Sequence, residues 1–279
     1  MRPAGPEVRI DLARRQALSL QGLRPLRIAH RGASARAPEN TLAAFREAVR
    51  LGADAVECDV RLSGDGKPVV IHDDTVDRTT DGRGMVARLP LAELRRLDAG
   101  SWFASRFRGE RIPTLEETFE FARGRCGLNL EIKGAAADAD GDGATIRAVA
   151  RSLAASGFRD PLIVSSFSRQ ALILARSAMP RVRLGLLVSR SLRGLRSAHR
   201  LTGLAAVHPH VRLASRRRMR LVHALGLLVL FWTVNERRLI RRLQDLGADG
   251  LMTDDPALFL DLRAGDGKRS FLGRIRRRR

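Results

Sequence analysis

Two histidines and two carboxylates lie close together in the chain, within residues 28–74. Glu57 and Asp59 are separated by one residue in an apolar segment, and His30 and His72 each follow a short apolar run. Carboxylate oxygens suit a hard divalent cation, and imidazoles exchange protons near neutral pH. Together these residues predict a metal-assisted acid–base site. The alternative is an acidic hairpin beside two unrelated histidines at strand ends.

The order of apolar and turn-forming residues predicts how these side chains are positioned. We expect a strand over 54–62, a tight turn at Gly64-Asp65-Gly66 and a returning strand over 68–72. Residues two apart on a strand share a face, so both carboxylates would point the same way. The turn would bring His72 back beside them, and His30 would end a neighbouring strand.

Strand-like and helix-like segments alternate along the rest of the chain. We expect strands over 27–30, 54–62, 127–132, 161–165, 182–188, 204–208, 227–233 and 249–253, and helices over 38–51, 114–123, 144–156, 168–178, 191–201, 212–225, 235–246 and 256–263. Eight strand–helix units predict an α/β fold, a (β/α)8 TIM barrel, with a β-hairpin and a small insertion after the second strand.

One large domain accounts for most of the chain, because 279 residues with 44% hydrophobic content can bury a substantial core. We expect an N-terminal extension over 1–26, the barrel domain over 27–265 and a basic tail over 266–279. A polar, arginine-rich insertion at about 61–112 would interrupt the barrel.

The net charge of +21 is unevenly distributed along the chain. Residues 1–150 contain 24 basic and 22 acidic side chains, whereas residues 151–279 contain 27 basic and 8 acidic ones. A solvated surface is the simplest interpretation of most of these arginines. A basic half also attracts polyanions, so an anionic membrane is a candidate partner of the C-terminal half, and nucleic acid is a less favoured one.

Two further features bear on the cellular compartment. Residues 1–26 contain no apolar run long enough for a signal peptide, and we expect a cytoplasmic protein, with peripheral contact at the membrane as an extension of that view. Cys58 and Cys126 lie in or beside expected core strands. Both are expected to be buried thiols, because disulfides are rare in that compartment.

Polar residues mark the ends of the expected strands, where the functional groups of a TIM barrel lie. They are His30-Arg31, Glu57 and Asp59, Glu131 and Lys133, Ser165 to Phe167, His208, Trp232 and Thr253-Asp254. Glu131 and Lys133 are notable because charge inside a strand is costly unless it is paired or binds a metal. A structural salt bridge is the alternative to a role in the site.

Short motifs in this order resemble the glycerophosphodiester phosphodiesterase family. They are HRG (30–32), PENT (38–41), ExD (57–59), HD (72–73), IPTLEE (112–117), NLEIK (129–133), SSF (165–167), WTVN (232–235) and TDDP (253–256). The resemblance extends over about residues 27–260. It implies a metal-dependent TIM-barrel phosphodiesterase that cleaves glycerophosphodiesters to glycerol 3-phosphate and an alcohol.

The resemblance also implies roles for charged residues. Glu57, Asp59 and Glu131 would hold one divalent cation, Mg²⁺ or Ca²⁺, through oxygen ligands. Arg31 and Lys133 would neutralise the phosphodiester as charge develops in the transition state. We therefore prefer this assignment of Glu131 and Lys133 to the structural salt bridge.

The remaining roles concern proton transfer and substrate contact. His30 and His72 would lie on opposite sides of the phosphorus, one activating the nucleophile and the other protonating the leaving alkoxide, in either order. The nucleophile would be water or a neighbouring glycerol hydroxyl. Glu39 is a substrate-site residue by resemblance, or else a first-turn acid favoured by the helix dipole. Trp232 is either barrel packing or, as the family favours, a wall against the substrate.

Two other functions fit parts of the same pattern. A lysophospholipase D or sphingomyelinase D-like phosphodiesterase would use the same barrel with another substrate. A catalytically inactive barrel that binds membranes or RNA through its basic half is the alternative from a different class, and the complete set of carboxylates and histidines argues against it.

Overall fold

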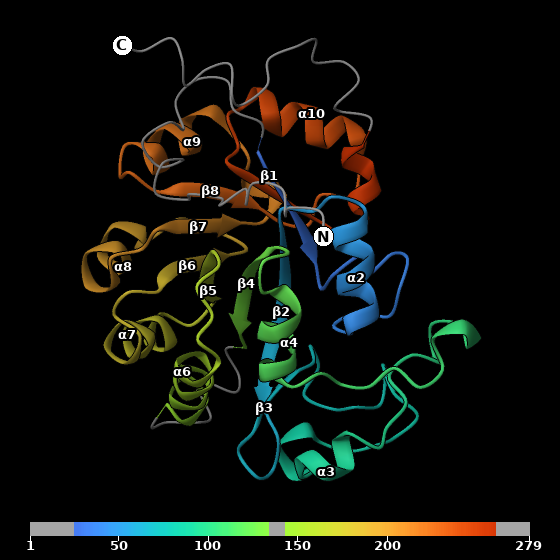
Figure 1. Ribbon diagram of the computed structural model, residues 1–279. Helices are drawn as coiled ribbons and strands as arrows, with labels where there is room; N and C mark the ends of the chain where they lie inside the picture. Colours follow the sequence, from blue (N-terminus) through green and yellow to red (C-terminus); the bar gives the residue numbers. More distant parts are fainter. Residues whose placement is uncertain (1–24, 134–142, 261–279) are drawn as a thin grey trace, which may run out of the picture.

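Eight parallel strands form a closed barrel in the computed structural model, which describes residues 25–133 and 143–260 (Figure 1). The barrel strands are β1 (Leu26–His30), β2 (Ala55–Leu62), β4 (Gly127–Ile132), β5 (Leu162–Ser166), β6 (Arg183–Val188), β7 (Ala206–Pro209), β8 (Leu228–Phe231) and β9 (Gly250–Thr253). β1 pairs with both β2 and β9, which closes the ring. The expected TIM barrel is confirmed.

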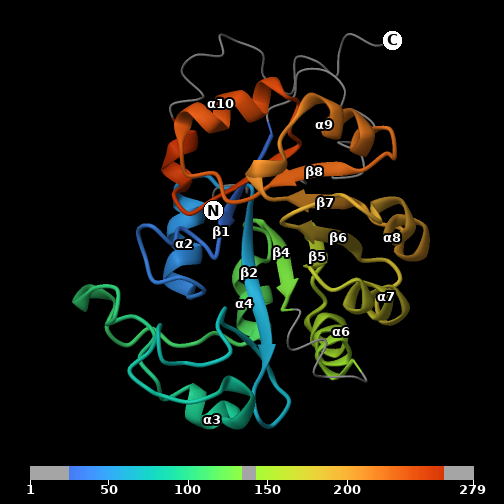
Figure 2. The same cartoon turned by 180° about the vertical axis from the view of Figure 1, so that it is seen from behind.

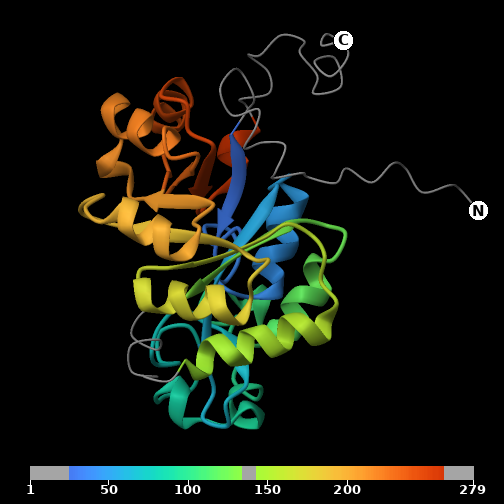
Figure 3. The same cartoon turned by 90° about the vertical axis from the view of Figure 1, so that its left-hand side faces the viewer.

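Helices cover the outside of this barrel. They are α2 (Leu42–Arg50), α4 (Leu115–Ala122), α6 (Ala144–Ser156), α7 (Arg169–Ala178), α8 (Leu195–Thr202), α9 (Arg216–His223) and α10 (Arg237–Asp245). Figure 3 faces the side of the barrel that α6, α7 and α8 cover. Side-chain oxygens of Thr41, Thr114, Ser168 and Ser215 accept a backbone N–H at the starts of α2, α4, α7 and α9, so local capping fixes where these helices begin.

Alternate strand residues face two different environments. Outward-facing residues such as Cys58 pack under the helices in the largest hydrophobic cluster, while Ile28 and Ile163 belong to a separate cluster inside the barrel. Since successive residues of a strand point to opposite faces, Glu57 and Asp59 point to the interior when Cys58 points outward. The expected orientation of the two carboxylates is confirmed.

The hairpin expected after the second strand is present. β3 (Pro68–Val70) runs antiparallel to β2, and Val60 pairs with Val70. Continuing this register places His72 opposite Cys58, as expected, although the strand itself ends two residues earlier. Hydrogen bonds close the turn, including one of 2.9 Å from the Ser63 N–H to the Lys67 carbonyl.

The insertion that follows β3 has a hydrophobic cluster of its own. It contains η1 (Val86–Arg88), the short α3 (Leu91–Leu94) and η2 (Ser105–Phe107). Val76, Val86, Leu94 and Ile112 are among its buried residues, and they pack with Val69 and Ile71 from the hairpin. Figure 2 shows the insertion at the opposite end of the molecule from α9 and α10.

Some expected helix boundaries are wrong. The helix expected over 212–225 is divided into η3 (Val211–Leu213) and α9, because Ser215 caps a new helix after Leu213. The segment after β9 forms only a 3₁₀ turn, η4 (Pro256–Phe259), in its described part. These are ends of elements, and the order of strands and helices matches the expectation.

Other expectations concern the thiols and the chain ends. Cys58 and Cys126 are both buried and unpaired. Among the described residues, no helix combines the length and apolar character needed to cross a membrane. Residues 1–24 of the expected extension and the tail over 266–279 lie outside the described residues, so the expected division of the chain stays a prediction.

Candidate active site

Three carboxylates from β2 and β4 meet inside the barrel. Glu57 and Asp59 come from β2, Glu131 comes from β4, and one oxygen of each lies within 4.8 Å of the others. Asp59 pairs with Glu131 across the two parallel strands, and this register brings their side chains together. All three residues are buried. The expected trio of carboxylates is therefore assembled by two neighbouring strands.

The carboxylates strongly perturb one another. Burial, followed by the charge of Asp59, raises the pKa of Glu57 and that of Glu131. Burial acts the same way on Asp59, but Lys133 and Arg31 outweigh it and hold the pKa of Asp59 below its ordinary value. Three acids at this separation repel each other unless positive charge or a proton lies among them.

This arrangement could hold a divalent cation. All the ligand atoms are carboxylate oxygens, which hard cations such as Mg²⁺ and Ca²⁺ prefer. Oε1 of Glu57 is buried and has no hydrogen-bond partner among the described residues. An acceptor that is buried, anionic and unpaired is what a cation ligand requires, so the donor set fits such an ion.

His30 is fixed by a carboxylate from the last strand of the barrel. Its Nδ1 lies 2.6 Å from Oδ1 of Asp254, and its Nε2 lies 4.0 Å from Oε2 of Glu57. Burial opposes protonation of His30, but the hydrogen bond to Asp254 and the charge of Glu57 outweigh it and raise its pKa. Ser34 Oγ donates a further hydrogen bond of 3.2 Å to Asp254. One ring nitrogen is therefore engaged, and the other faces the carboxylates.

His72 has a similar partner in its neighbour. Its Nδ1 lies 2.6 Å from Oδ1 of Asp73, and both side chains are partly buried. Burial lowers the pKa of His72, with Asp59 and Asp73 acting against this effect. Both expected histidines thus use Nδ1 for a carboxylate and leave Nε2 available.

Arg31 and Lys133 supply the positive charge of the site. Lys133 Nζ lies 2.8 Å from Glu131 Oε1 and 3.2 Å from Asp59 Oδ1. Arg31 Nε lies 3.5 Å from Asp59 Oδ2, and its backbone N–H donates to Glu57 over 2.9 Å. Both cations lie beside the carboxylates, as expected. Lys133 forms a salt bridge with Glu131 and also lies in the site, so the two interpretations of this pair are compatible.

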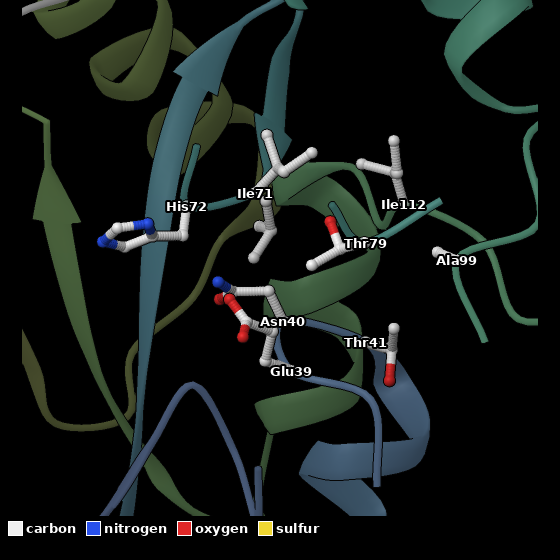
Figure 4. A pocket seen from close by; sticks show the side chains of 9 residues that line it. Glu39, Asn40, Thr41, Ile71, His72, Thr79, Ala99 and Ile112 are labelled. Atoms are coloured by element: carbon white, nitrogen blue, oxygen red, sulfur yellow. The ribbon is translucent and has the colours of Figure 1, made fainter. Parts of the chain in front are cut away.

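Glu39 and Asn40 approach the site from the turn before α2. Glu39 Oε1 accepts from Arg31 Nη1 over 2.9 Å, and Asn40 Nδ2 donates to Asp59 Oδ2 over 2.8 Å. Figure 4 shows both side chains close to His72, around a small pocket that Thr79 also lines. The side chain of Glu39 is 13% exposed and contacts arginine side chains. The alternative of a first-turn acid is wrong, because α2 begins at Leu42 after its cap, Thr41.

Comparisons with known proteins agree with this geometry. The model of the glycerophosphoryl diester phosphodiesterase family matches residues 30–258. The chain belongs to this family. It is 37% identical over 243 residues to a glycerophosphodiester phosphodiesterase of Caldanaerobacter subterraneus subsp. tengcongensis, covering 86% of this chain and 98% of that one. A Bacillus subtilis glycerophosphodiester phosphodiesterase is 30% identical over 256 residues, with 87% of each chain covered.

A solved structure extends the comparison. The chain resembles an Oleispira antarctica phosphodiesterase in complex with the product sn-glycerol-3-phosphate, with a TM-score of 0.81, 37% identity and coverage of 86% of this chain and 97% of that one. The family resemblance inferred from the motifs is therefore confirmed. The protein is a glycerophosphodiester phosphodiesterase, a phosphoric diester hydrolase.

Aromatic side chains that follow β5, β7 and β8 also meet beyond the ends of their strands. Trp232 makes edge-to-face contacts with Phe167 (ring centroids 5.5 Å apart) and His210 (5.0 Å). Its indole N–H donates to the His208 carbonyl over 2.8 Å. Phe167 is 42% exposed, so the group reaches solvent. Trp232 is both packed and partly accessible, and its contact with substrate stays a prediction.

His208 lies deeper, inside the barrel. It is fully buried, and burial lowers its pKa to about 3. A Cβ at Gly185 would lie only 2.5 Å from its Nε2, so the glycine leaves room for the ring. His208 therefore lies within the barrel, below its mouth.

The sequence-based interpretation missed several partners of the expected residues. The sequence placed Asp254 among the residues at the ends of the expected strands and gave Asn235 no role in the site. Instead, Asn235 Nδ2 donates to Asp254 Oδ2, and its Oδ1 accepts from the Asp254 N–H over 2.9 Å. Glu236 is the residue at the α10 cap. The motifs WTVN and TDDP contain both residues, but local sequence gives no signal that Asn235 meets Asp254 or that Asp254 meets His30.

Proposed function

We propose that this enzyme hydrolyses glycerophosphodiesters to glycerol 3-phosphate and an alcohol with the help of one divalent cation. The supporting observation is the buried trio of Glu57, Asp59 and Glu131, with a histidine near each of the two β2 carboxylates. Family membership supplies the reaction class, and the carboxylates supply the reason for a metal. Mg²⁺ and Ca²⁺ both fit an all-oxygen site.

In this proposal the cation would polarise the phosphoryl oxygens and offset their negative charge. Arg31 and Lys133 lie next to the proposed cation site, beside Asp59. A phosphodiester bound there is within their reach, and they neutralise part of its negative charge. Glu39 holds the Arg31 guanidinium in place through a 2.9 Å contact. Trp232 bounds the space for the substrate.

His30 and His72 transfer the protons. Each has Nδ1 bound to a carboxylate, which leaves Nε2 as the atom that accepts or donates a proton at the substrate. One takes the proton of the nucleophile, and the other returns one to the leaving alkoxide, so that the leaving group departs as a neutral alcohol.

The test is release of glycerol 3-phosphate from glycerophosphocholine and glycerophosphoethanolamine, measured with excess EDTA and then with added Mg²⁺ or Ca²⁺. Lysophosphatidylcholine in parallel distinguishes a lysophospholipase D. We expect activity on the glycerophosphodiesters that EDTA abolishes and a cation restores. Full activity in excess EDTA contradicts metal dependence, and exclusive cleavage of lysophosphatidylcholine contradicts the substrate assignment.

We further propose that the basic C-terminal half keeps this enzyme, a cytoplasmic protein, in peripheral contact with anionic membranes. The support is a hollow lined by Arg216 of α9, by Arg238, Arg241 and Arg242 of α10, and by Asp245. The four arginine side chains have no hydrogen bond or ion pair with the described residues. Unpaired arginines attract an anionic surface, each contributing about 1 kcal/mol.

Co-sedimentation with vesicles tests this contact. Replacing Arg238, Arg241 and Arg242 by glutamine should weaken binding to anionic vesicles at low salt. Replacing Arg83, Arg88 and Arg108 of the insertion removes the same charge elsewhere and should have a smaller effect. Equal losses in the two triple variants, or equal binding to neutral vesicles, contradict the proposal, and tighter binding to RNA than to vesicles favours nucleic acid.

A further inference from the structure

One arginine of the insertion, Arg78, contacts two carboxylates of the site, Asp73 and Glu39. Arg78 Nε lies 2.6 Å from Asp73 Oδ2, and its Nη2 lies 3.1 Å from Asp73 Oδ1. The same guanidinium contacts Glu39, with Nη1 at 2.8 Å from Oε2 and Nη2 at 2.8 Å from Oε1. Both carboxylates are bound in two-point contacts, the geometry in which a guanidinium orients its partner best.

The two carboxylates lead to different catalytic groups. Asp73 accepts from His72 Nδ1, and Glu39 accepts from Arg31. Arg78 therefore links the acid–base residue His72 to the phosphate-binding residue Arg31 through one shared guanidinium. Arg78 lowers the pKa of Asp73 and, against the effect of burial, that of Glu39, so both remain anionic and remain acceptors.

The insertion itself fixes where Arg78 lies. Val76 is fully buried in the hydrophobic cluster of the insertion, and its N–H donates to the Gly84 carbonyl over 3.0 Å. Thr80 Oγ1 donates back to the Val76 carbonyl over 2.8 Å, which closes the turn around Arg78. Thr79 lines the small pocket next to His72 and Glu39 (Figure 4). The turn is thus anchored on both sides of Arg78.

Arg78 has little capacity to bind substrate directly, because its guanidinium already donates to two carboxylates. A guanidinium has five N–H groups, and the contacts with Asp73 and Glu39 engage all three of its nitrogens. Its side chain is 45% exposed, so it lies at the rim and faces inward toward the two carboxylates. Its contacts are with residues that orient catalytic groups.

We infer that Arg78 is a positioning residue, which keeps His72 in its productive orientation and tautomer through Asp73 and restrains Glu39 beside Arg31. This inference rests on the role proposed for His72. With Asp73 held as a carboxylate, His72 keeps its proton on Nδ1 and presents Nε2 to the substrate. Without Arg78, Asp73 is free to rotate into solvent, and the ring loses its fixed direction.

The test is a double-mutant cycle on turnover with saturating cation and glycerophosphodiester. Arg78→Met keeps the aliphatic stem and removes the donors, and we expect kcat to fall about tenfold. In a His72→Ala background, the same change should lower kcat by clearly less than tenfold, because only the restraint of Glu39 beside Arg31 is then left to lose. Asp73→Asn breaks the link between Arg78 and His72 at the carboxylate and should reduce the effect of Arg78→Met in the same way.

Controls separate positioning from folding. Arg83→Met replaces an exposed arginine of the same insertion and should leave kcat unchanged. The thermal midpoint of Arg78→Met should lie within about 2–4 °C of the unaltered enzyme, because a half-exposed ion pair contributes little stability. An equal loss of kcat with and without His72 overturns the inference. If His72→Ala itself keeps full turnover, the proposed role of His72 is what fails.

Discussion

The two halves of the chain use charge in opposite ways. In the N-terminal half, arginines bind carboxylates: Arg31 contacts Glu39, and Arg78 contacts Asp73 and Glu39. In the C-terminal half they more often meet backbone carbonyls, as in the contacts of Arg176 with Thr202 and of Arg218 with Leu213, or line the hollow at α10. Paired charge in a buried site fixes geometry, whereas unpaired surface charge creates only a field.

The largest effect should come from the buried carboxylates. Glu57→Gln removes a proposed metal ligand, and we expect turnover to fall about 10³-fold with saturating Mg²⁺ or Ca²⁺. The metal-free variant should be at least as stable as the metal-free parent, since one of three repelling acids is gone. Thermal unfolding with EDTA and steady-state kinetics with metal measure both quantities. Unfolding of the variant would mean that Glu57 mainly supports the fold.

The histidines should give the next largest effect. His30→Ala and His72→Ala should each lower kcat by about 10²-fold, the usual scale for lost acid–base catalysis. The matched control is His223→Ala, which removes a contact between α9 and Asp249 outside the site. If either active-site variant changes only KM, that histidine binds substrate and does not transfer protons.

The pH dependence of metal binding gives a smaller, graded effect. Burial and mutual repulsion raise the pKa of Glu57 and Glu131 in the metal-free protein, so these groups retain protons above the ordinary carboxyl range. A cation requires the ionised forms, so binding releases protons and strengthens as pH rises, by about tenfold per unit for each proton displaced. Calorimetry in buffers of different ionisation enthalpy measures the release. A cation affinity that does not change with pH would contradict the predicted proton release.

The basic half should give the smallest effect on catalysis. Replacing Arg238, Arg241 and Arg242 by glutamine should change kcat and KM for soluble glycerophosphocholine by less than about twofold, because these side chains contact none of the described site residues and salt screens exposed charges. Kinetics at 0.15 M salt are the measurement. A large fall in kcat would show that these arginines of the C-terminal half also take part in catalysis.

The fold and most of the site could be predicted because they depend on local pattern. The period of two in β2 places Glu57 and Asp59 on one face, and the hairpin register returns His72 beside them. Glycine in HRG also has a local reason: Gly32 has φ 83°, and a Cβ there would lie 2.7 Å from that of Ala44. Such constraints leave a visible signature in the sequence.

The partners of these residues could not be predicted in the same way. His30 and Asp254 are 224 positions apart, and they meet only because β1 pairs with β9 when the barrel closes. Asn40 adopts φ 57° and turns its amide to Asp59, a conformation that the letters PENT do not reveal. Arg78 lies in a segment whose sequence indicated only an irregular insertion. All three contacts join side chains of different segments, so the pattern within one strand or helix does not reveal them.

Cys58 gives this barrel a built-in chemical probe. It lies between the two carboxylates of β2 on the opposite face, is fully buried, and burial holds its pKa well above the ordinary value. A thiol in that state reacts with an alkylating reagent only when the strand opens. The rate of alkylation therefore reports how often the strand carrying Glu57 and Asp59 separates from its neighbours, and a cation bound on its inner face should slow that rate.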